Sequence, residues 1–210
     1  MEFEGKSVDN AVFDSFDIDN ISVAPLLFQT GYLTVKEVKK VGVRHKYTLS
    51  YPNQEVKESF LKHLLAGFTE APASELGSSI LELVECIIEN DTSGFFSIIE
   101  KIFASIPYNI FIKDREAYYS TVIYLVMNLV GVSVKSEVQT NLGRVDAVLE
   151  TNTHIYVMEY KLGSADEAIK QVKEKKYYLP YLHGKKEVLI VGVGFDKDKK
   201  NISSYIIKKP

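Results

Sequence analysis

Residues 144–161, RVDAVLETNTHIYVMEYK, contain two short segments in which apolar and polar residues alternate, with a polar turn between them. This alternation predicts half-buried strands, and the short polar connection predicts a hairpin. If Asn152 and Thr153 are the centre of the turn, Asp146 lies opposite Glu159. Directly opposed residues share a face of the sheet, with Cβ atoms roughly 4.5–5.5 Å apart. The sequence therefore predicts two neighbouring carboxylates.

These carboxylates are candidate metal ligands. Opposed carboxylates repel each other, so a divalent cation, a shared proton or a nearby lysine has to offset the repulsion. Mg²⁺ binds oxygen ligands, and the expected set is Asp146, Glu159 and the main-chain carbonyl of Tyr160. Bound metal would acidify a water molecule and stabilise charge on a phosphate. Lys161, on the same face as Glu159, would orient that water or neutralise the oxyanion, which suits phosphodiester hydrolysis.

An ordinary ion pair is the alternative interpretation of the same residues. An acidic residue followed at a loose distance by E-x-K often occurs by chance, and paired surface Glu and Lys residues are common. On this interpretation the chain is a folded interaction domain, and Asp146, Glu159 and Lys161 have no catalytic role.

The segments around the hairpin extend the pattern to a larger fold. A nearly all-apolar helix precedes it, with Asp114 as the expected N-cap and Gly131 as its end. A helix with Ser164 and Glu167 as its capping box follows it. A continuous apolar run then predicts a strand buried on both faces, which completes a right-handed βαβ unit. The expected helices are 79–90, 93–106, 115–131 and 164–179, and the expected strands are 132–139, 143–150, 154–161 and 186–195.

A smaller module precedes this region. A short helix, two strands at 32–38 and 46–51 and an amphipathic helix predict a helix–hairpin–helix arrangement, winged or lid-like in shape. Residues 70–78, EAPASELGS, combine small residues with Pro and Gly and predict a boundary. The expected domains are therefore residues 1–72 and 73–210.

The composition is that of a globular chain. Of its 210 residues, 46% are hydrophobic and 25% are charged. No apolar run reaches the roughly 18 residues of a membrane span, and the start is too polar for a signal peptide. We therefore expect a cytoplasmic protein that does not bind membranes. One cysteine and four scattered histidines argue against a zinc site.

Positive charge is concentrated near the C-terminus. Residues 161–210 hold 12 Lys and no Arg against 6 acidic residues, and the remaining chain has 13 basic against 22 acidic residues. The C-terminal lysines could face phosphates. The alternative is a solvated helix face followed by a lysine-rich turn.

Over about residues 110–207 the chain resembles the PD-(D/E)XK nuclease superfamily. The resemblance rests on Asp146 in GRVDAVLE, on the E-x-K formed by Glu159, Tyr160 and Lys161, and on the order of the expected elements. It implies an α/β, restriction-endonuclease-like fold, with an αβββαβ core around a mixed central sheet. It also implies a nuclease that requires Mg²⁺ or Mn²⁺. Val145 occupies the position of the proline in the motif's name.

A bacterial family within this superfamily is similar over REAYYSTVIYLVMNLVG, SEVQTNLGRVDAVLE, YVMEYKL and AIKQVKEKKYY. In that family such a domain follows an AAA-ATPase-like region. Residues 19–68 of this chain resemble the end of that region. This chain lacks a G-x-x-x-x-G-K-[ST] motif, so we expect a fragment, a truncated gene or a stand-alone descendant. The resemblance implies Glu116 as the acidic residue of the first core helix and Gln171 as a polar residue near the site. The alternatives are a helix-start glutamate favoured by the dipole and a solvent-facing glutamine.

Two functional hypotheses follow. The first is a Mg²⁺-dependent DNA nuclease in which Asp146 and Glu159 bind the metal, Lys161 stabilises charge, and Glu116 and Gln171 assist. The second is a catalytically inactive nuclease-fold module that binds nucleic acid or a protein partner in a regulatory role. An ATPase-like partner or domain absent from this chain is an expected associate under both.

Overall fold

The computed structural model describes residues 4–13, 22–69, 71–107, 116–131, 133–140 and 143–210. The chain forms two compact units, Met1–Leu61 and Lys62–Pro210, and the division falls inside helix α2 (Gln54–Thr69). The boundary expected from composition, between residues 72 and 73, stays a prediction. No helix in the described part of the chain is long and apolar enough to cross a membrane.

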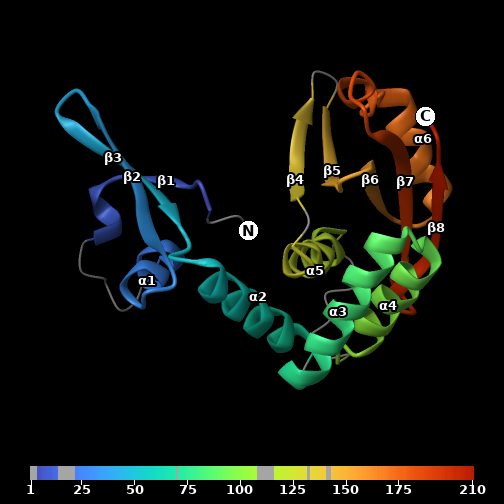
Figure 1. Ribbon diagram of the computed structural model, residues 1–210, viewed down its shortest axis with the longest axis horizontal. Coiled ribbons are helices and arrows are strands. Elements are labelled where there is room, and N and C mark those ends of the chain that lie inside the picture. Colours follow the sequence, from blue (N-terminus) through green and yellow to red (C-terminus); the bar gives the residue numbers. More distant parts are fainter. Residues whose placement is uncertain (1–3, 14–21, 70, 108–115, 132, 141–142) are drawn as a thin grey trace. The chain divides into compact units, whose positions relative to one another are not determined.

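The N-terminal unit has the expected helix–hairpin–helix order. Its sheet has the strand order β1-β3-β2, in which β2 and β3 form the hairpin (Figure 1). The short β1 and the 3₁₀ helix η1 were not expected, because two to four residues carry too little periodicity to detect. Ala24 and Leu27 of α1 form a small core with Leu33 and with Leu49 of β3. The elements are β1 (Ser7–Val8), η1 (Asn10–Phe13), α1 (Val23–Gln29), β2 (Thr34–Val41), β3 (Arg44–Ser50) and the start of α2.

The second unit contains a mixed five-stranded sheet with the order β4-β5-β6-β7-β8. Only β6 and β7 pair in parallel, as the predicted βαβ unit requires, and the other neighbours are antiparallel. The predicted α/β core of helix, three strands, helix and strand is confirmed, and β8 extends it by one edge strand. The strands are β4 (Ser133–Thr140), β5 (Gly143–Glu150), β6 (His154–Leu162), β7 (Glu187–Asp196) and β8 (Asn201–Lys208).

The β5–β6 hairpin has the predicted register. Ala147 pairs with Met158 and Val148 with Val157. The Thr151 N–H donates to the His154 carbonyl at 2.9 Å and closes the turn. The ladder ends at the Ala147–Met158 pair, one position before Asp146 and Glu159 would pair, so the two strands separate there.

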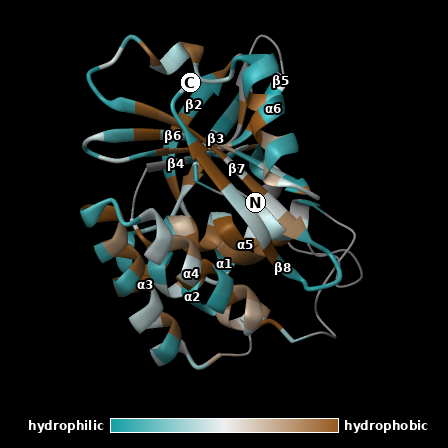
Figure 2. Ribbon diagram, turned by 90° about the vertical axis from the view of Figure 1, so that its right-hand side faces the viewer, coloured by the Kyte–Doolittle hydropathy of each residue, from teal (hydrophilic) through white to brown (hydrophobic). Residues whose placement is uncertain are grey.

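Helix α6 (Ala165–Lys175) packs closely on one face of the sheet. The Ser164 side chain accepts a hydrogen bond from the Glu167 N–H, as the predicted capping box requires. On β7, a Cβ atom added at Gly192 would lie 2.5 Å from the Ala165 carbonyl, and one at Gly194 would lie 2.5 Å from the Gly163 carbonyl. The two glycines therefore let the start of the helix reach the sheet. In Figure 2, α6 carries both hydrophobic and hydrophilic residues, as expected for a helix with one buried side.

Three helices cover the opposite face. Phe195 follows Gly194 and so points away from α6, to contact Phe103 and Tyr119 with ring centroids 5.5 and 4.4 Å away. Helix α5 is largely buried, as its apolar sequence predicts, and Gly131 follows it with a φ of 76°. The expected cap Asp114 lies outside the described residues. The helices are α3 (Ala73–Glu89), α4 (Thr92–Ala104) and α5 (Glu116–Leu129).

Helix α3 begins at Ala73, before the residue 79 that the apolar pattern predicted. The segment ASELGS has few apolar residues, and its serines and glycine resemble a linker. In the structure Leu76 is buried at 3% exposure, so this first turn packs against the unit. Packing therefore overrides the weak helix propensity of these residues.

Candidate active site

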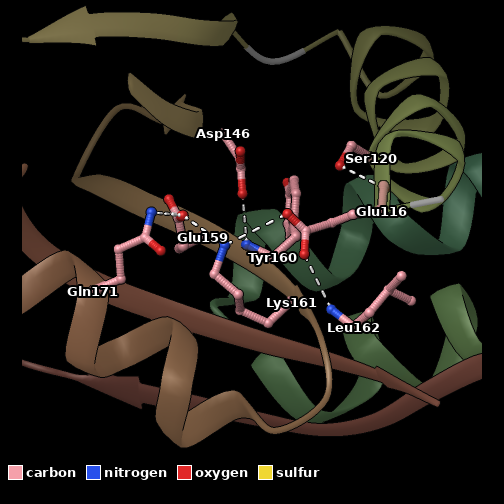
Figure 3. A network of polar contacts seen from close by, with 8 residues as sticks. All are labelled: Glu116, Ser120, Asp146, Glu159, Tyr160, Lys161, Leu162 and Gln171. Atoms are coloured by element: carbon pink, nitrogen blue, oxygen red, sulfur yellow. Dashed lines mark hydrogen bonds and ion pairs between the residues drawn. The ribbon is translucent and has the colours of Figure 1, made fainter. Parts of the chain in front are cut away.

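Five side chains predicted from the sequence meet where β5 and β6 separate. They are Glu116, Asp146, Glu159, Lys161 and Gln171 (Figure 3). Helix α5 supplies the first, the two strands supply the next three, and helix α6 supplies the last. Residues distant in sequence thus form one polar network at the end of the two interior strands β5 and β6.

Glu159 is the most buried member of the network, with 1% of its surface exposed. Its Oε1 accepts hydrogen bonds from Lys161 Nζ at 3.2 Å and from Gln171 Nε2. Its Oε2 is also buried, and no described residue provides it with a hydrogen-bond partner. Burial, and next the negative charge of Asp146, raise the pKa of Glu159 to about 7, against the opposing effect of Lys161. The surroundings of this carboxylate therefore provide too little positive charge and too few hydrogen-bond donors to stabilise its ionised form.

Asp146 takes part in the network through the backbone of the adjacent strand. Its Oδ2 accepts a hydrogen bond from the Tyr160 N–H at 2.8 Å, where the β5–β6 ladder has already ended. Burial raises the pKa of Asp146, although this hydrogen bond and the charge of Lys161 partly counteract it. In a strand, the N–H and C=O of one residue point toward the same edge. The Tyr160 carbonyl therefore points toward the side on which Asp146 lies.

Lys161 lies between two glutamates. Its Nζ is 3.2 Å from Glu159 Oε1 and 3.5 Å from Glu116 Oε1. Burial alone would lower the pKa of Lys161, but the charges of Glu159 and Glu116 outweigh it and the net shift is upward. The side chain is thus held as an ammonium ion.

Glu116 is the first residue of α5 and connects this helix to β6. Besides contacting Lys161, it accepts a hydrogen bond on Oε2 from the Leu162 N–H at 3.1 Å. The Ser120 hydroxyl donates to the Glu116 carbonyl at 3.1 Å. The interpretation of Glu116 as a helix-start residue describes its position, but its carboxylate also belongs to the site.

Gln171 reaches the site because α6 lies so close to the sheet. It is partly buried and donates to Glu159, so the alternative of a solvent-facing glutamine is wrong. Glu159 and Lys161 of β6 pair with Gly192 and Gly194 of β7. The absence of side chains at these glycines leaves the space that α6 fills.

These glycines and the Leu162 N–H are contributors that the sequence interpretation missed. The alternation VGVG in residues 191–194 was an available signal, since glycine inside a strand often marks the close approach of another backbone. The sequence contained no signal for the hydrogen bond from the Leu162 N–H to Glu116, because nearly every residue has a backbone N–H and the residue type does not show which one is used.

The residues fit a hard divalent cation in their chemistry. The buried Glu159 Oε2 without a partner, the Asp146 carboxylate and the Tyr160 carbonyl are oxygen donors, which Mg²⁺ prefers. Among the residues that the structure describes, no group of three or more His, Cys, Asp and Glu side chains is arranged around a possible metal position. Any ion here would therefore depend on two carboxylates, a backbone carbonyl and water or substrate oxygens.

The mixed sheet, the flanking helices and the D…E-x-K network define a restriction-endonuclease-like α/β domain. Residues 114–205 match the model of the PD-(D/E)XK nuclease superfamily, a segment that contains all five side chains. This part of the chain is a domain of the PD-(D/E)XK nuclease superfamily.

One relative extends the similarity over nearly the whole chain. The chain is 32% identical over 206 residues to a protein of Azotobacter chroococcum mcd 1 named "uncharacterized protein in vnfD 5′region". The alignment covers 95% of this chain and 40% of the relative, so the chain spans about two fifths of the relative's length. No solved structure matches the chain.

Proposed function

We propose that the chain is a cytoplasmic, Mg²⁺- or Mn²⁺-dependent nuclease that hydrolyses phosphodiester bonds of DNA. The observation that carries the proposal is the buried Glu159 Oε2, which lacks a hydrogen-bond partner among the described residues and lies in a network with Asp146 and Lys161. An unpartnered buried carboxylate oxygen is costly, and a divalent cation would offset that cost. The superfamily of residues 114–205 supports the same reaction.

Each residue has a role in this proposal. Asp146, Glu159 and the Tyr160 carbonyl would hold the ion, which when bound acidifies a water molecule and neutralises charge on the scissile phosphate. Lys161, an ammonium group, stabilises the charge that develops on the phosphate oxygens. Glu116 and Gln171 are positioning residues, because they act through Lys161 and Glu159.

A second candidate is a nuclease-fold module without catalytic activity that binds nucleic acid or a protein partner. The ion pairs of Lys161 with both Glu159 and Glu116 favour it, because the lysine offsets part of the negative charge of these carboxylates without a metal. Under either candidate, we propose an ATPase-like partner or domain as the associate of this chain. The relative from Azotobacter is long enough to contain further domains, since the chain spans only 40% of it.

Cleavage of labelled DNA distinguishes the two candidates. Branched, single-stranded and duplex substrates are incubated with Mn²⁺ or Mg²⁺ and the full chain. We expect Glu159→Gln to lower the initial rate by roughly 100-fold or more, and Gln171→Ala by roughly 10- to 100-fold. The exposed Glu167→Gln on α6 is the matched control and should retain the wild-type rate. Cleavage that persists in Glu159→Gln, or is absent from the wild type on all three substrates, would contradict the nuclease proposal.

Metal binding can be measured without cleavage. Mn²⁺ at about 100 times its Kd should stabilise the wild type by roughly 2.7 kcal/mol, which raises Tm by several degrees. Asp146→Ala removes one expected ligand, so its Tm should not respond to Mn²⁺ in differential scanning calorimetry. Equal shifts in both proteins would show that the ion binds elsewhere.

A further inference from the structure

The hairpin of the N-terminal unit carries a second concentration of charge, remote in sequence from the D…E-x-K network. Residues 36–46, here called the basic hairpin, are all exposed. They include five cationic side chains and one acidic side chain, Glu37. The cationic residues are Lys36, Lys39, Lys40, Arg44 and Lys46. None of these five forms an ion pair with another described residue.

The register of the hairpin places two lysines directly opposite each other and a further lysine on the other face. Lys39 pairs with Lys46 and the next pair is Lys40 with His45. Since successive residues of a strand point to opposite faces, the first pair lies on one face of the ribbon and the second on the other. Like charges directly opposite each other destabilise a hairpin. A polyanion bound against the face that carries Lys39 and Lys46 would remove that repulsion.

The basic hairpin also has an apolar tip without a core to cover it. Val41 and Arg44 are the last pair before a two-residue turn, in which Gly42 has a φ of 63°. Val43 follows at 95% exposure, and Val41 is 55% exposed. Figure 1 shows the hairpin extending beyond β1 and α1 of its own unit. Five paired residues span roughly 17 Å, so this ribbon is slender and mostly unsupported.

We propose that the basic hairpin binds duplex DNA by inserting into the major groove. This groove is roughly 12 Å wide and admits a two-stranded ribbon, with a phosphate backbone on each side. Cations on both faces match those two backbones, whereas an acidic protein surface would contact one face only. The exposed valines at and near the tip would meet base edges such as the thymine methyl group. The choice of DNA rests on the proposed function, but the binding does not require catalysis.

Fluorescence anisotropy of a labelled 20-base-pair duplex with the full chain in EDTA tests this surface without cleavage. The variant Lys39→Glu/Lys46→Glu reverses two charges of the hairpin. The control Lys101→Glu/Lys208→Glu makes the same change in net charge at exposed positions of α4 and β8. At 0.1 M salt the hairpin variant should bind the duplex roughly 10- to 100-fold more weakly. The slope of log K against log salt concentration should be less steep, by an amount that corresponds to the loss of about two phosphate contacts. The control should stay within roughly threefold of the wild type.

A second variant, Lys39→Gln/Lys46→Gln, removes the two positive charges without introducing negative ones. It shows whether weaker binding comes from lost phosphate contacts or from charge repulsion and misfolding. Removal of the opposed lysines should leave Tm unchanged or raise it, while duplex binding still weakens roughly tenfold. Equal weakening by the hairpin and control variants, no binding by the wild type, or tighter binding of single strands or RNA would each overturn the proposal.

The two proposals fail separately. If no substrate is cleaved but binding depends on the hairpin lysines, the nuclease proposal falls and the hairpin proposal stands. If cleavage depends on Glu159 while the substitutions of Lys39 and Lys46 leave duplex binding unchanged, the nuclease proposal stands and the hairpin proposal falls.

Discussion

Glu159 is held where its negative charge is disfavoured. It is almost fully buried, and Lys161 and Gln171 satisfy only one of its two carboxylate oxygens. Its folded-state pKa of about 7 is above the ordinary value of 4.5, so the folded protein binds this proton more tightly than the unfolded chain does. Stability should therefore fall as pH rises from about 4.5 to about 7, and then become constant. A group with this property is suited to a ligand that supplies positive charge.

Glu159→Gln should remove this pH-dependent cost. In the absence of metal, the variant should be more stable than the wild type at pH 8, by at most about 3 kcal/mol, since one pKa unit corresponds to about 1.4 kcal/mol. At pH 4.5 the two proteins should differ much less, because the wild-type carboxyl is then neutral when folded. Urea unfolding at the two pH values measures the difference.

Glu85→Gln is the control for the loss of one carboxylate, because Glu85 is exposed on α3. Its effect should be small at both pH values. An advantage of Glu159→Gln that is the same at pH 4.5 and pH 8 would show that burial does not hold Glu159 protonated.

At the scale of elements, the position of α6 depends on two glycines of β7. Gly192 and Gly194 are adjacent to Glu159 and Lys161 in the parallel ladder, and the start of α6 occupies the space above them. Side chains at these positions would meet backbone atoms, which cannot rotate away. Gln171 contacts Glu159 only because this close packing is possible.

Gly194→Ala should therefore displace α6. The new Cβ would lie 2.5 Å from the Gly163 carbonyl and 2.7 Å from the Ala165 nitrogen. Overpacking of this kind typically costs about 1–3 kcal/mol of stability, and cleavage should fall as Gln171 moves away from Glu159. Denaturant unfolding and the cleavage assay measure the two effects.

Gly184→Ala is the matched control, because the nearest atom to its added Cβ is 3.7 Å away, an ordinary contact distance. It should change stability by less than about 1 kcal/mol. If the two alanine variants have the same stability and activity, close packing at Gly194 does not position the helix.

At the scale of the whole molecule, the two compact units divide inside α2. The composition predicts a boundary at residues 72 and 73, whereas the compact units meet between Leu61 and Lys62. Phe68, in the second half of α2, contacts Tyr118 of α5 with ring centroids 5.6 Å apart. Leu65 is fully buried. The second half of the helix thus contributes to the unit that contains the site.

Two truncated chains test the boundary. We expect residues 62–210 to melt at a higher temperature than residues 73–210, because the shorter chain lacks Leu65 and Phe68. Loss of a large buried side chain such as Leu65 costs about 2–5 kcal/mol. Each kcal/mol lowers Tm by roughly 2–4 °C in a chain of this size. Thermal unfolding by circular dichroism is the measurement. Equal melting temperatures would support the boundary at 72 and 73.

The sequence alone determined the β5–β6 hairpin, its register and the βαβ unit, because strand alternation and turn residues are local. These elements also determined the position of Asp146, Glu159 and Lys161 on two neighbouring interior strands. The edge strand β8 and the early start of α3 were not predicted, since both depend on packing against distant residues.

Only the tertiary structure decided how the site is completed. Glu116 and Lys161 are 45 positions apart, and no periodicity relates residues at that separation. Their contact, and that of Gln171 with Glu159, exist because α5 and α6 pack on a sheet whose two glycines leave room for a helix. Local pattern sets which face a side chain occupies, whereas the distance between faces is set by close packing of the whole unit.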